Sequence, residues 1–418
     1  MPRVARNVLK DIFAAAIAAT NGTSRTKEAL SGFEPAGSCY LLAIGKAAPA
    51  MAAGALAVLE PKVCEALIVC PGLANQPPDL LPDDRSRVLH AGHPLPDERS
   101  LAAGAAVLEF VRKPKPPDSL LVLISGGAST LVEVLPDDVT LDDLEHLNRS
   151  LLASGWSIDE INMVRRSVSM IKGGRLAREV GTDTVLCLGL SDVPDDRFED
   201  IGSGPLSPSP GNPTSIPRVP DRIAAMMGAA PPAPEPNDPC FERFEYRVIA
   251  TLDDALDAAV AEAGCCGRVV QRATERLCGD AEEAGHRIGA DLRNGAPGFY
   301  FWGGETTVRL PPGPGQGGRC QALSLAAAQE FHGCPDVVLL AAGTDGQDGP
   351  GKAAGAIVDG GTVVRGYRCG FGPREAQRQA DTGTFLAAAD DLFVTAPTGT
   401  NVNDIVVGLK TAPGGFVT

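Results

Sequence analysis

The sequence predicts an α/β protein of two Rossmann-like three-layer domains, with largely parallel sheets and a cleft between the domains. Three observations lead to this fold class. Short apolar runs alternate with segments of helical periodicity along most of the 418 residues. Several runs, such as LLVLI at 120–124 and VVLLAA at 337–342, are apolar on both faces, which is typical of parallel strands covered by helices on each side. A proline-rich stretch interrupts the alternation near residues 205–239.

The alternation indicates βαβ units, because a parallel strand pair needs a helical crossover between its members. The expected strands are residues 40–44, 66–70, 120–124, 184–190, 246–252, 267–272, 298–302, 336–342 and 392–396. The expected helices lie near residues 4–20, 47–59, 98–112, 141–153, 158–180, 254–263, 280–293, 319–331 and 374–388.

The proline-rich stretch sets the expected domain boundary. Six prolines lie between residues 205 and 220, and PPAPEPNDP follows at residues 231–239. Such a composition indicates a surface loop or a linker. We place the boundary at residue 235, which gives an N-terminal domain at 1–235 and a smaller C-terminal domain at 236–418.

Composition excludes several classes of protein. Hydrophobic residues make up 44% and charged residues 21%, which is ordinary for a globular protein. The net charge of −15 argues against nucleic acid or an anionic membrane as partner. The 11 cysteines form no CxxC pair, which indicates buried thiols in a reducing compartment. We therefore expect a cytoplasmic monomer or homodimer that acts on a small molecule.

The first candidate for chemistry is Lys46, which follows the apolar run at 41–44 and precedes a helix of small residues. A lysine at the carboxyl end of a strand lies where open α/β sheets bind their ligands. Beside helix amides it suits an anion, although a solvated loop lysine has the same local sequence.

Two further segments suit phosphate. After the strand at 120–124 come Ser125, Gly126, Gly127, Ala128 and Ser129, whose amides and hydroxyls suit an anion or simply form a tight turn. The basic segment near 158–178 carries Lys172, Gly173 and Gly174, which suit phosphate binding or a solvated basic face.

Carboxylates follow two other strands. Asp192 comes after the strand at 184–190, and Asp345 comes after the strand at 336–342. A carboxylate in such a position suits Mg²⁺ on a nucleotide, which needs one or two protein carboxylates. A turn or helix-capping aspartate is the alternative interpretation.

The C-terminal half supplies Glu305 after a strand and Arg319 at the start of a helix. An arginine beside exposed helix amides favours an anion. The loop before it contains GxGxxG as Gly313, Gly315 and Gly318, but its prolines indicate a loop, not a dinucleotide-binding turn. Asn401 and Asp404 follow the last expected strand and either bind ligand hydroxyls or hold turn positions.

Together these junctions suit phosphoryl transfer, with cations and amides for phosphates, carboxylates for Mg²⁺ and polar groups for a small substrate. The carboxyl ends of parallel strands share one edge of a sheet, so the loops could converge on a cleft. His90 and His93 lack a third metal ligand, and we interpret their segment as a loop.

The motifs in their order resemble those of the glycerate 2-kinase family over nearly the whole chain. These motifs are LAIGKAA, AGHPLPDE, SGGAST, NMVRRSVSMIKGGRLA, SDVPDDRFEDIGSGP, GGETTV, GGRCQALSLA, GTDGQDGP and PTGTNVND. The resemblance implies an N-terminal glycerate-kinase domain and a C-terminal leucine-rich fragment domain. It also implies phosphorylation of the 2-hydroxyl of D-glycerate with ATP and Mg²⁺, although some members are labelled hydroxypyruvate reductases.

The resemblance assigns Lys46 and Arg319 to the transferred phosphoryl group, where they would stabilise its charge. The chain departs from the family pattern at Ala128 for a glycine, Cys320 for an asparagine, Gly351-Lys352 for Thr-Asp, and Ser167 for a histidine. These departures leave the exact hydroxy acid open. A NAD(P)H-dependent hydroxypyruvate reductase and a non-catalytic binding homologue are the alternative functions.

Overall fold

The computed structural model describes residues 2–72, 85–153, 158–209 and 221–412. Contacts divide the chain into two compact units. One unit is Gly22–Thr251, called here the N-terminal domain, and the other combines Met1–Asn21 with Leu252–Thr418, called here the C-terminal domain. The change of unit at Thr251 comes later than the boundary expected at residue 235, because the intervening strand pairs within the N-terminal domain.

The N-terminal domain is built on a six-stranded sheet in which all neighbouring strands are parallel. Its order is β3 (Ser86–Ala91), β2 (Val63–Pro71), β1 (Cys39–Ile44), β4 (Ser119–Ile124), β5 (Thr184–Leu190) and β6 (Phe244–Ala250). This is the strand order of the doubly wound dinucleotide-binding fold. The order reverses between β1 and β4, so the carboxyl ends of these two strands flank the topological switch point.

Helices cover both faces of this sheet. On one face, Leu42 and Ile44 share a buried cluster with Val107 and Phe110 of α4 (Glu98–Val111). Leu41 and Ala43 alternate to the other face and are fully buried. There α3 (Ala48–Leu59) packs on β1, β2 and β4, and α2 (Gly22–Ala29) packs on α3 and on β5 and β6.

The remaining described elements of the N-terminal domain are α-helices and 3₁₀ turns. The α-helices are α5 (Ala128–Leu131), α6 (Leu141–Ala153), α7 (Ile158–Ser167) and α8 (Asp221–Met226). The 3₁₀ turns are η1 (Glu60–Lys62), η2 (Arg175–Glu179), η3 (Phe198–Ser203) and η4 (Pro239–Phe241). The helix expected at 158–180 ends at Ser167, and beyond it Gly173 and Gly174 both adopt left-handed backbone angles, which a continuous helix excludes.

The sheet of the C-terminal domain is mixed, which corrects the expectation of two largely parallel sheets. Its order is β11 (Leu392–Phe393), β10 (Gly355–Asp359), β9 (Val337–Gly343), β12 (Asp404–Lys410), β8 (Gly298–Gly304) and β7 (Val270–Arg272). Strand β12 lies antiparallel to both β8 and β9, and β10 is antiparallel to β9 and β11. The link from β9 to β10 contains no helix, so the chain has no crossover with which to return in parallel.

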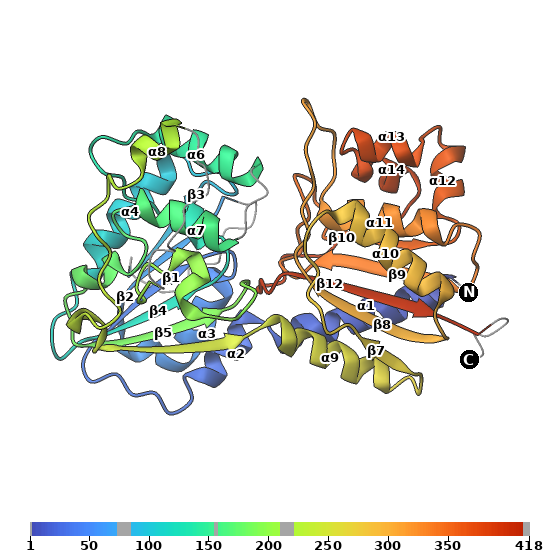
Figure 1. Ribbon diagram of the computed structural model, residues 1–418. Coiled ribbons are helices and arrows are strands. Elements are labelled where there is room, and N and C mark those ends of the chain that lie inside the picture. Colours follow the sequence, from blue (N-terminus) through green and yellow to red (C-terminus); the bar gives the residue numbers. More distant parts are fainter. Residues whose placement is uncertain (1, 73–84, 154–157, 210–220, 413–418) are drawn as a thin grey trace. The chain divides into compact units, whose positions relative to one another are not determined.

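Three layers form this domain as well (Figure 1). The helices α10 (Ala281–Asn294) and α11 (Arg319–Glu330) pack together on one face of the sheet and contact β12, β9 and β10. The helix α9 (Leu252–Gly264) packs with α1 (Pro2–Ala19) on the opposite face. The helices α12 (Thr362–Arg368), α13 (Pro373–Arg378) and α14 (Thr382–Ala388) pack beside α11.

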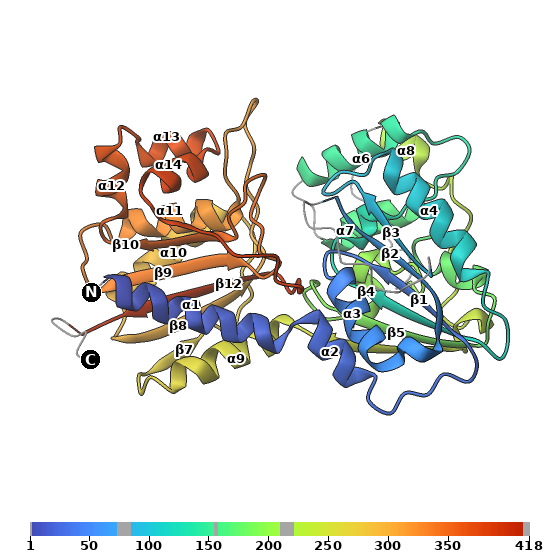
Figure 2. The ribbon, with the colours of Figure 1, turned by 180° about the vertical axis from the view of Figure 1, so that it is seen from behind.

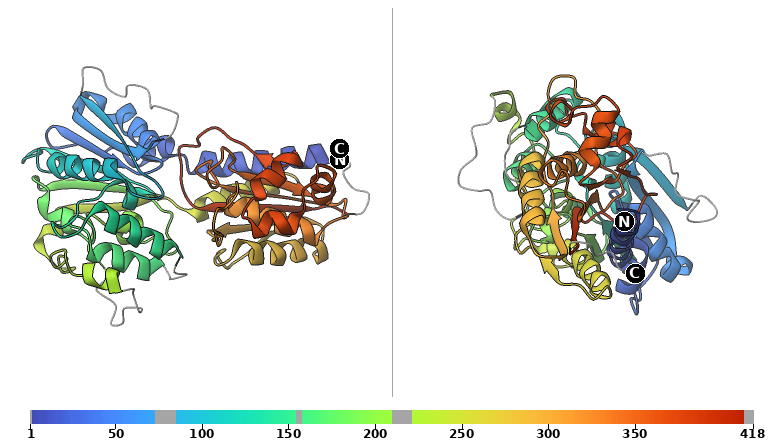
Figure 3. Two further views of the ribbon diagram at one scale, coloured as in Figure 1. Left: turned by 90° about the horizontal axis from the view of Figure 1, so that it is seen from above. Right: turned by 90° about the vertical axis from the view of Figure 1, so that its right-hand side faces the viewer.

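Helix α1 is part of the C-terminal domain although it comes first in the sequence. Figure 2 shows it lying across the sheet of β8, β9 and β12, and Figure 3 shows it along the segments coloured orange and red. Arg6 bonds to Asp359 at 2.7 Å and also to Asp391, and the ring of Phe13 packs edge-on against Phe393 at 5.3 Å between centroids. An ion-pair network and an apolar stripe thus fix this helix.

Strands β3, β10 and β12 were not expected from the sequence, and the expected strand at 392–396 is reduced to two residues. Strand β3 at SRVLHA is an edge strand that mixes polar and apolar residues, so it lacks the continuous apolar run of the central strands. No helix within the described ranges has the length and apolar character that crossing a bilayer requires.

Candidate active site

Hydrogen bonds join the ends of β1 and β4 at the switch point. Gly45 has a φ of +130°, and a β-carbon there would lie 2.2 Å from Oγ of Ser125, so glycine alone fits. The Lys46 amide donates to the Gly126 carbonyl at 2.9 Å, and the Ala47 amide donates to Ser125 Oγ at 3.1 Å. The predicted Lys46 therefore stands, half-buried, at the carboxyl edge of the central strands.

The predicted phosphate loop, residues 125–129, divides into an inner and an outer part. Ser125, Gly126 and Ala128 are buried, whereas Gly127 and Ser129 are partly accessible. Ser129 Oγ lies 3.0 Å from Oγ of Ser203. The methyl group of Ala128, which replaces the family's glycine, lines a small interior cavity. Accessible ligand contacts from this loop would come from Gly127 and Ser129.

His93 is a neighbour of Lys46 that sequence reasoning placed in an uninvolved loop. A β-carbon built on Gly127 would lie 3.1 Å from Cδ2 of His93 and 3.3 Å from Cγ of Lys46. The three residues therefore meet at one point, where His93 is exposed and Lys46 is half-buried. His93 follows the missed strand β3, so recognising β3 would have revealed one more strand-to-glycine junction with a polar residue.

Lys172, predicted to bind phosphate, lies in the interior of the N-terminal domain. Its ammonium group donates to Glu133, whose other oxygen accepts from Ser169 Oγ at 2.5 Å. The side chains of Lys172 and Glu133 are 3% and 2% exposed, and burial lowers the pKa of Lys172. Both charges are thus matched inside the protein.

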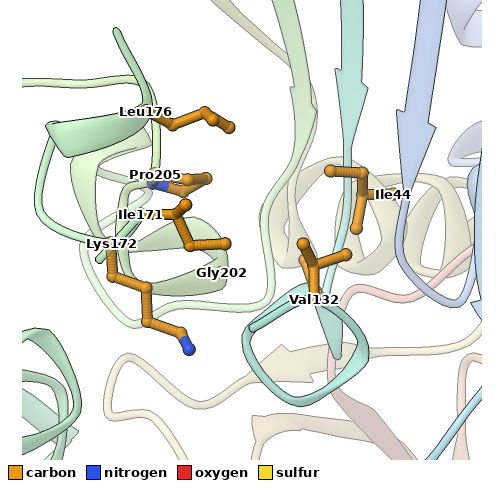
Figure 4. A pocket seen from close by; sticks show the side chains of 8 residues that line it. Ile44, Val132, Ile171, Lys172, Leu176, Gly202 and Pro205 are labelled. Carbon is orange, nitrogen blue, oxygen red and sulfur yellow. The ribbon is translucent and has the colours of Figure 1, made fainter. Parts of the chain in front are cut away.

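The cavity beside Lys172 is far too small for a substrate. It measures about 10 Å³, room for roughly one water molecule. Figure 4 shows Ile171 and Lys172 on one side of it and Ile44 and Val132 on the other. A ligand role for Lys172 stays a prediction, and this geometry gives it no support.

The glycine pair after Lys172 supports a strained turn. The Gly173 and Gly174 amides donate to the carbonyls of Ser203 and Gly204, at 3.2 and 2.7 Å. Ser203 has a φ of 65°, uncommon for a residue with a side chain, and its hydroxyl donates to Asn162 at 2.8 Å. Such strain is concentrated at functional sites, and Ser203 contacts the accessible Ser129.

In the C-terminal domain, Arg319 begins helix α11 and forms ion pairs with two of the predicted residues. Its Nε and Nη2 groups donate to the two oxygens of Asp404 at 2.6 and 2.9 Å, and Nη1 lies 2.8 Å from Glu305. Burial alone would lower the pKa of Arg319, but the carboxylates of Asp404 and Glu305 raise it well above its ordinary value. The guanidinium group is therefore permanently charged.

Asp348 is a buried carboxylate that the sequence predictions did not select. It accepts hydrogen bonds from the amides of Cys320 and Gln321 at 3.1 and 2.9 Å, and from Gln321 Nε2 at 3.0 Å. The helix amides expected to be exposed beside Arg319 are therefore already bonded. Burial, with the nearby charge of Asp404, raises the pKa of Asp348 to about 6.

Close packing brings Asp348 to the helix. A β-carbon on Gly318 would lie 2.2 Å from Oδ1 of Asp348, so only glycine permits this approach. Asp348 therefore caps helix α11 from another loop, and it fixes the position from which Arg319 extends.

The remaining predicted residues follow strand ends. Asp192 lies after β5 in the N-terminal domain, and Asp345 lies after β9 in the C-terminal domain, where it accepts from the Gln347 amide at 2.9 Å. Asn401 is buried in the loop before β12. Within the part of the chain that is described, no three His, Cys, Asp or Glu residues gather as a metal site. Magnesium binding by Asp192 and Asp345 stays a prediction.

The other departures from the family pattern differ in setting. Cys320 is buried, and burial raises its pKa well above the ordinary value. Gly351 and Lys352 are exposed. Ser167 bonds through its hydroxyl to the Val164 carbonyl at 2.8 Å at the end of α7.

Two sequence families match the chain. The family described as Domain of unknown function (DUF4147) matches residues 8–231, which is more than half of the chain, and the MOFRL family matches residues 298–404.

Named relatives cover most of the chain. It is 36% identical over 379 residues to a protein named D-glycerate 2-kinase from Thermotoga maritima, with 88% of this chain and 90% of the relative covered. It is 35% identical over 386 residues to a protein from Agrobacterium vitis named "Putative hydroxypyruvate reductase", with 88% and 98% covered.

A solved structure matches the fold over both domains. The crystal structure of a glycerate kinase from Thermotoga maritima aligns with a TM-score of 0.78 and 33% identity, covering 98% of this chain and 99% of that one. Sequence families, relatives and fold agree over nearly the full length. The chain therefore belongs to the glycerate 2-kinase family.

Proposed function

We propose that this protein is an ATP-dependent, Mg²⁺-requiring kinase that phosphorylates the 2-hydroxyl of D-glycerate or of a closely related small hydroxy acid. The observation that carries the proposal is Lys46 at the switch point of a parallel sheet, in a chain of this family. Ligands of open α/β sheets bind at this place, and a lysine there suits phosphate.

In this proposal Lys46 and Arg319 both stabilise the charge of the phosphoryl group during transfer. Gly127, Ser129 and Ser203 would bind the polar parts of the substrates through amide and hydroxyl groups. Asp192 and Asp345 are accessible carboxylates of the kind that hold Mg²⁺, which would neutralise phosphate charge when bound. His93 would accept or orient the proton of the attacking hydroxyl.

The reductase alternative receives less support. The glycines at 313–318 follow β8 only after an intervening segment, and Asp348 already bonds the amides at the start of α11. A dinucleotide pyrophosphate needs a tight strand-to-helix turn with available amides. The same amides therefore offer little to NAD(P)H.

The test is ADP release by the full chain with MgATP and a panel of three- and four-carbon hydroxy acids. We expect turnover with D-glycerate, and ³¹P NMR should show the product phosphorylated at the 2-oxygen. Hydroxypyruvate with NADPH or NADH, followed at the nicotinamide absorbance, tests the reductase in parallel and should give no oxidation.

Substitution connects the activity to the site. Lys46→Ala and Arg319→Ala should each lower kcat/KM by roughly 10³-fold, the scale found when one cation is removed from a phosphoryl-transfer site. Lys27→Ala, an exposed lysine on α2, is the matched control and should leave kinetics unchanged. Absence of turnover on every acid, together with unchanged nucleotide affinity in Lys46→Ala, would defeat the proposal.

A further inference from the structure

Arg319 is held by two carboxylates of different character. Asp404 begins β12 opposite Gly304, the last residue of β8, and Glu305 follows Gly304 directly. Two neighbouring strands therefore deliver the two acids to one guanidinium group. Asp404 accepts two hydrogen bonds in a fork, whereas Glu305 takes one contact, at 2.8 Å.

The two acids differ most in exposure. The side chain of Asp404 is 4% exposed, and that of Glu305 is 49% exposed. A buried, bidentate pair is costly to separate, because either charge would be left without a partner. A half-exposed, single-contact pair contributes little, since water solvates both groups when it opens.

The net charge of Arg319, Asp404 and Glu305 together disfavours the binding of a further anion. One guanidinium and two carboxylates sum to −1, so a phosphate that approaches Arg319 meets net repulsion while both acids remain. Asp348 bonds the Cys320 and Gln321 amides at the start of α11, which fixes the backbone from which Arg319 extends, and the two hydrogen bonds from Asp404 hold its guanidinium group. Glu305 is therefore the group that can leave.

We propose that Asp404 is a positioning residue that orients Arg319, and that Glu305 occupies Arg319 until an anionic phosphate displaces it. The inference rests on the proposed function, in which Arg319 contacts the transferred phosphoryl group. It assigns Glu305 and Asp404, both candidate site residues from the sequence, to the arginine instead. Glu305 then lowers anion affinity, and Asp404 supports catalysis.

The first experiment compares Glu305→Gln with the unchanged chain. Binding of inorganic phosphate and of the ATP analogue AMPPNP with Mg²⁺ is measured by calorimetry, and kcat and KM are measured by ADP release. We expect both dissociation constants and the KM for ATP to fall about threefold to tenfold, with kcat unchanged or lower, because uniform binding improves. A rise in the dissociation constants would overturn the proposal and mark Glu305 as a ligand contact.

The matched control is Glu330→Gln, which removes another half-exposed carboxylate of the same domain from its 2.7 Å pair with His286. It should leave phosphate affinity unchanged. An equal gain in both variants would attribute the effect to overall charge and would contradict the displacement by phosphate.

The second experiment tests Asp404. Asp404→Asn should lower kcat about tenfold or more with a small change in KM, because Arg319 remains present but loses its orientation. Asp404→Glu keeps the charge, and it should recover part of kcat. If the asparagine variant is unstable to heat, the kcat of Asp404→Glu tests the positioning role in its place. A loss confined to KM would refute the positioning role.

Phosphate binding separates this inference from the proposed function. If the chain shows no kinase activity but Glu305→Gln still tightens phosphate, the kinase proposal fails and the displacement of Glu305 stands. If the kinase is active and phosphate affinity does not rise, the displacement fails alone.

Discussion

Lys172 and Arg319 have similar sequence surroundings but differ in how far the fold buries them and their ion-pair partners. Each is a basic residue beside a glycine pair, and each was predicted to bind phosphate. Lys172 and its partner Glu133 are both almost completely buried, whereas Arg319 is 28% exposed and one of its partners is half exposed. The difference shows that a cation beside glycines can form either an interior ion pair or a pair whose partner is exposed to solvent.

The reason for the difference lies in distant parts of the chain. Glu133 reaches Lys172 from the loop after α5, while Asp404 and Glu305 reach Arg319 from the ends of two strands. The Lys172–Glu133 pair lies among apolar side chains of the N-terminal core, so each charge stabilises the other in the absence of water. The Arg319–Glu305 pair at the strand ends remains in contact with water.

The largest test of this comparison is Lys172→Met, which leaves Glu133 buried without the cation that bonds to it directly. We expect the free energy of unfolding to fall by roughly 3–5 kcal/mol, the range for breaking a buried pair. Urea unfolding measures the loss, and kinetics per folded molecule should stay within about threefold, since no ligand contact is removed.

The double variant Lys172→Met/Glu133→Leu is the control for that prediction. It removes both charges of the pair and should recover part of the lost stability, because replacing a buried pair by apolar groups is often neutral. Arg165 and Ser169 also lose Glu133 in this variant, so we expect the recovery to be incomplete. Intact stability in Lys172→Met, together with a higher KM for ATP, would mean that the lysine faces a ligand after all.

Asp348 gives a pH test of the helix that carries Arg319. Its pKa is raised from 3.8 to about 6 in the folded protein, so folding favours the protonated form. Its contribution to stability is therefore present below about pH 4 and is lost as the pH rises through about 6. At about 1.4 kcal/mol per pKa unit, the change amounts to roughly 3 kcal/mol.

Asp348→Asn should remove this dependence while it keeps an oxygen for the helix amides. Urea unfolding of both proteins between about pH 4 and 7 gives the difference, in which the titrations of other groups cancel. A constant difference across this range would show that Asp348 does not titrate there, and would weaken the account of a buried acid beside Asp404.

The smallest expected effect concerns His93, which lies beside Lys46. His93→Gln should lower kcat/KM by roughly 10²-fold and change the pH profile of kcat, if the imidazole handles the hydroxyl proton. His90→Gln is the control, since His90 lies within β3 and contacts the Pro71 carbonyl at 3.3 Å. Equal effects of the two changes would assign His93 a structural part only.

Much of the fold could be predicted from the sequence, because central parallel strands are continuous apolar runs. The strand at 184–190 matches β5 in both limits, and the runs at 40–44 and 120–124 lie within β1 and β4. The mixed sheet could not be predicted in the same way. Strand direction depends on how links return along the sheet, and the β10 and β12 segments have no local mark of direction.

The sequence could predict the candidate residues that follow strands or begin helices, but it could not predict which side chains surround them. Lys46 and Arg319 follow from position after a strand or at the start of a helix. Their surroundings come from remote segments: His93 from the turn after β3, and Asp348 from the loop after β9. No spacing in the sequence connects these residues, so their proximity required coordinates.

The placement of α1 has a consequence for folding during synthesis on the ribosome. This helix leaves the exit tunnel before the N-terminal domain, yet Asp359, Asp391 and Phe393, which hold it, are translated only after that domain. The apolar face of α1, with Leu9 and Ile12, therefore stays exposed while the whole N-terminal domain is synthesised. Nascent chains should therefore present an exposed amphipathic helix to chaperones, and placing α1 after β12 by circular permutation should shorten the time for which it is exposed.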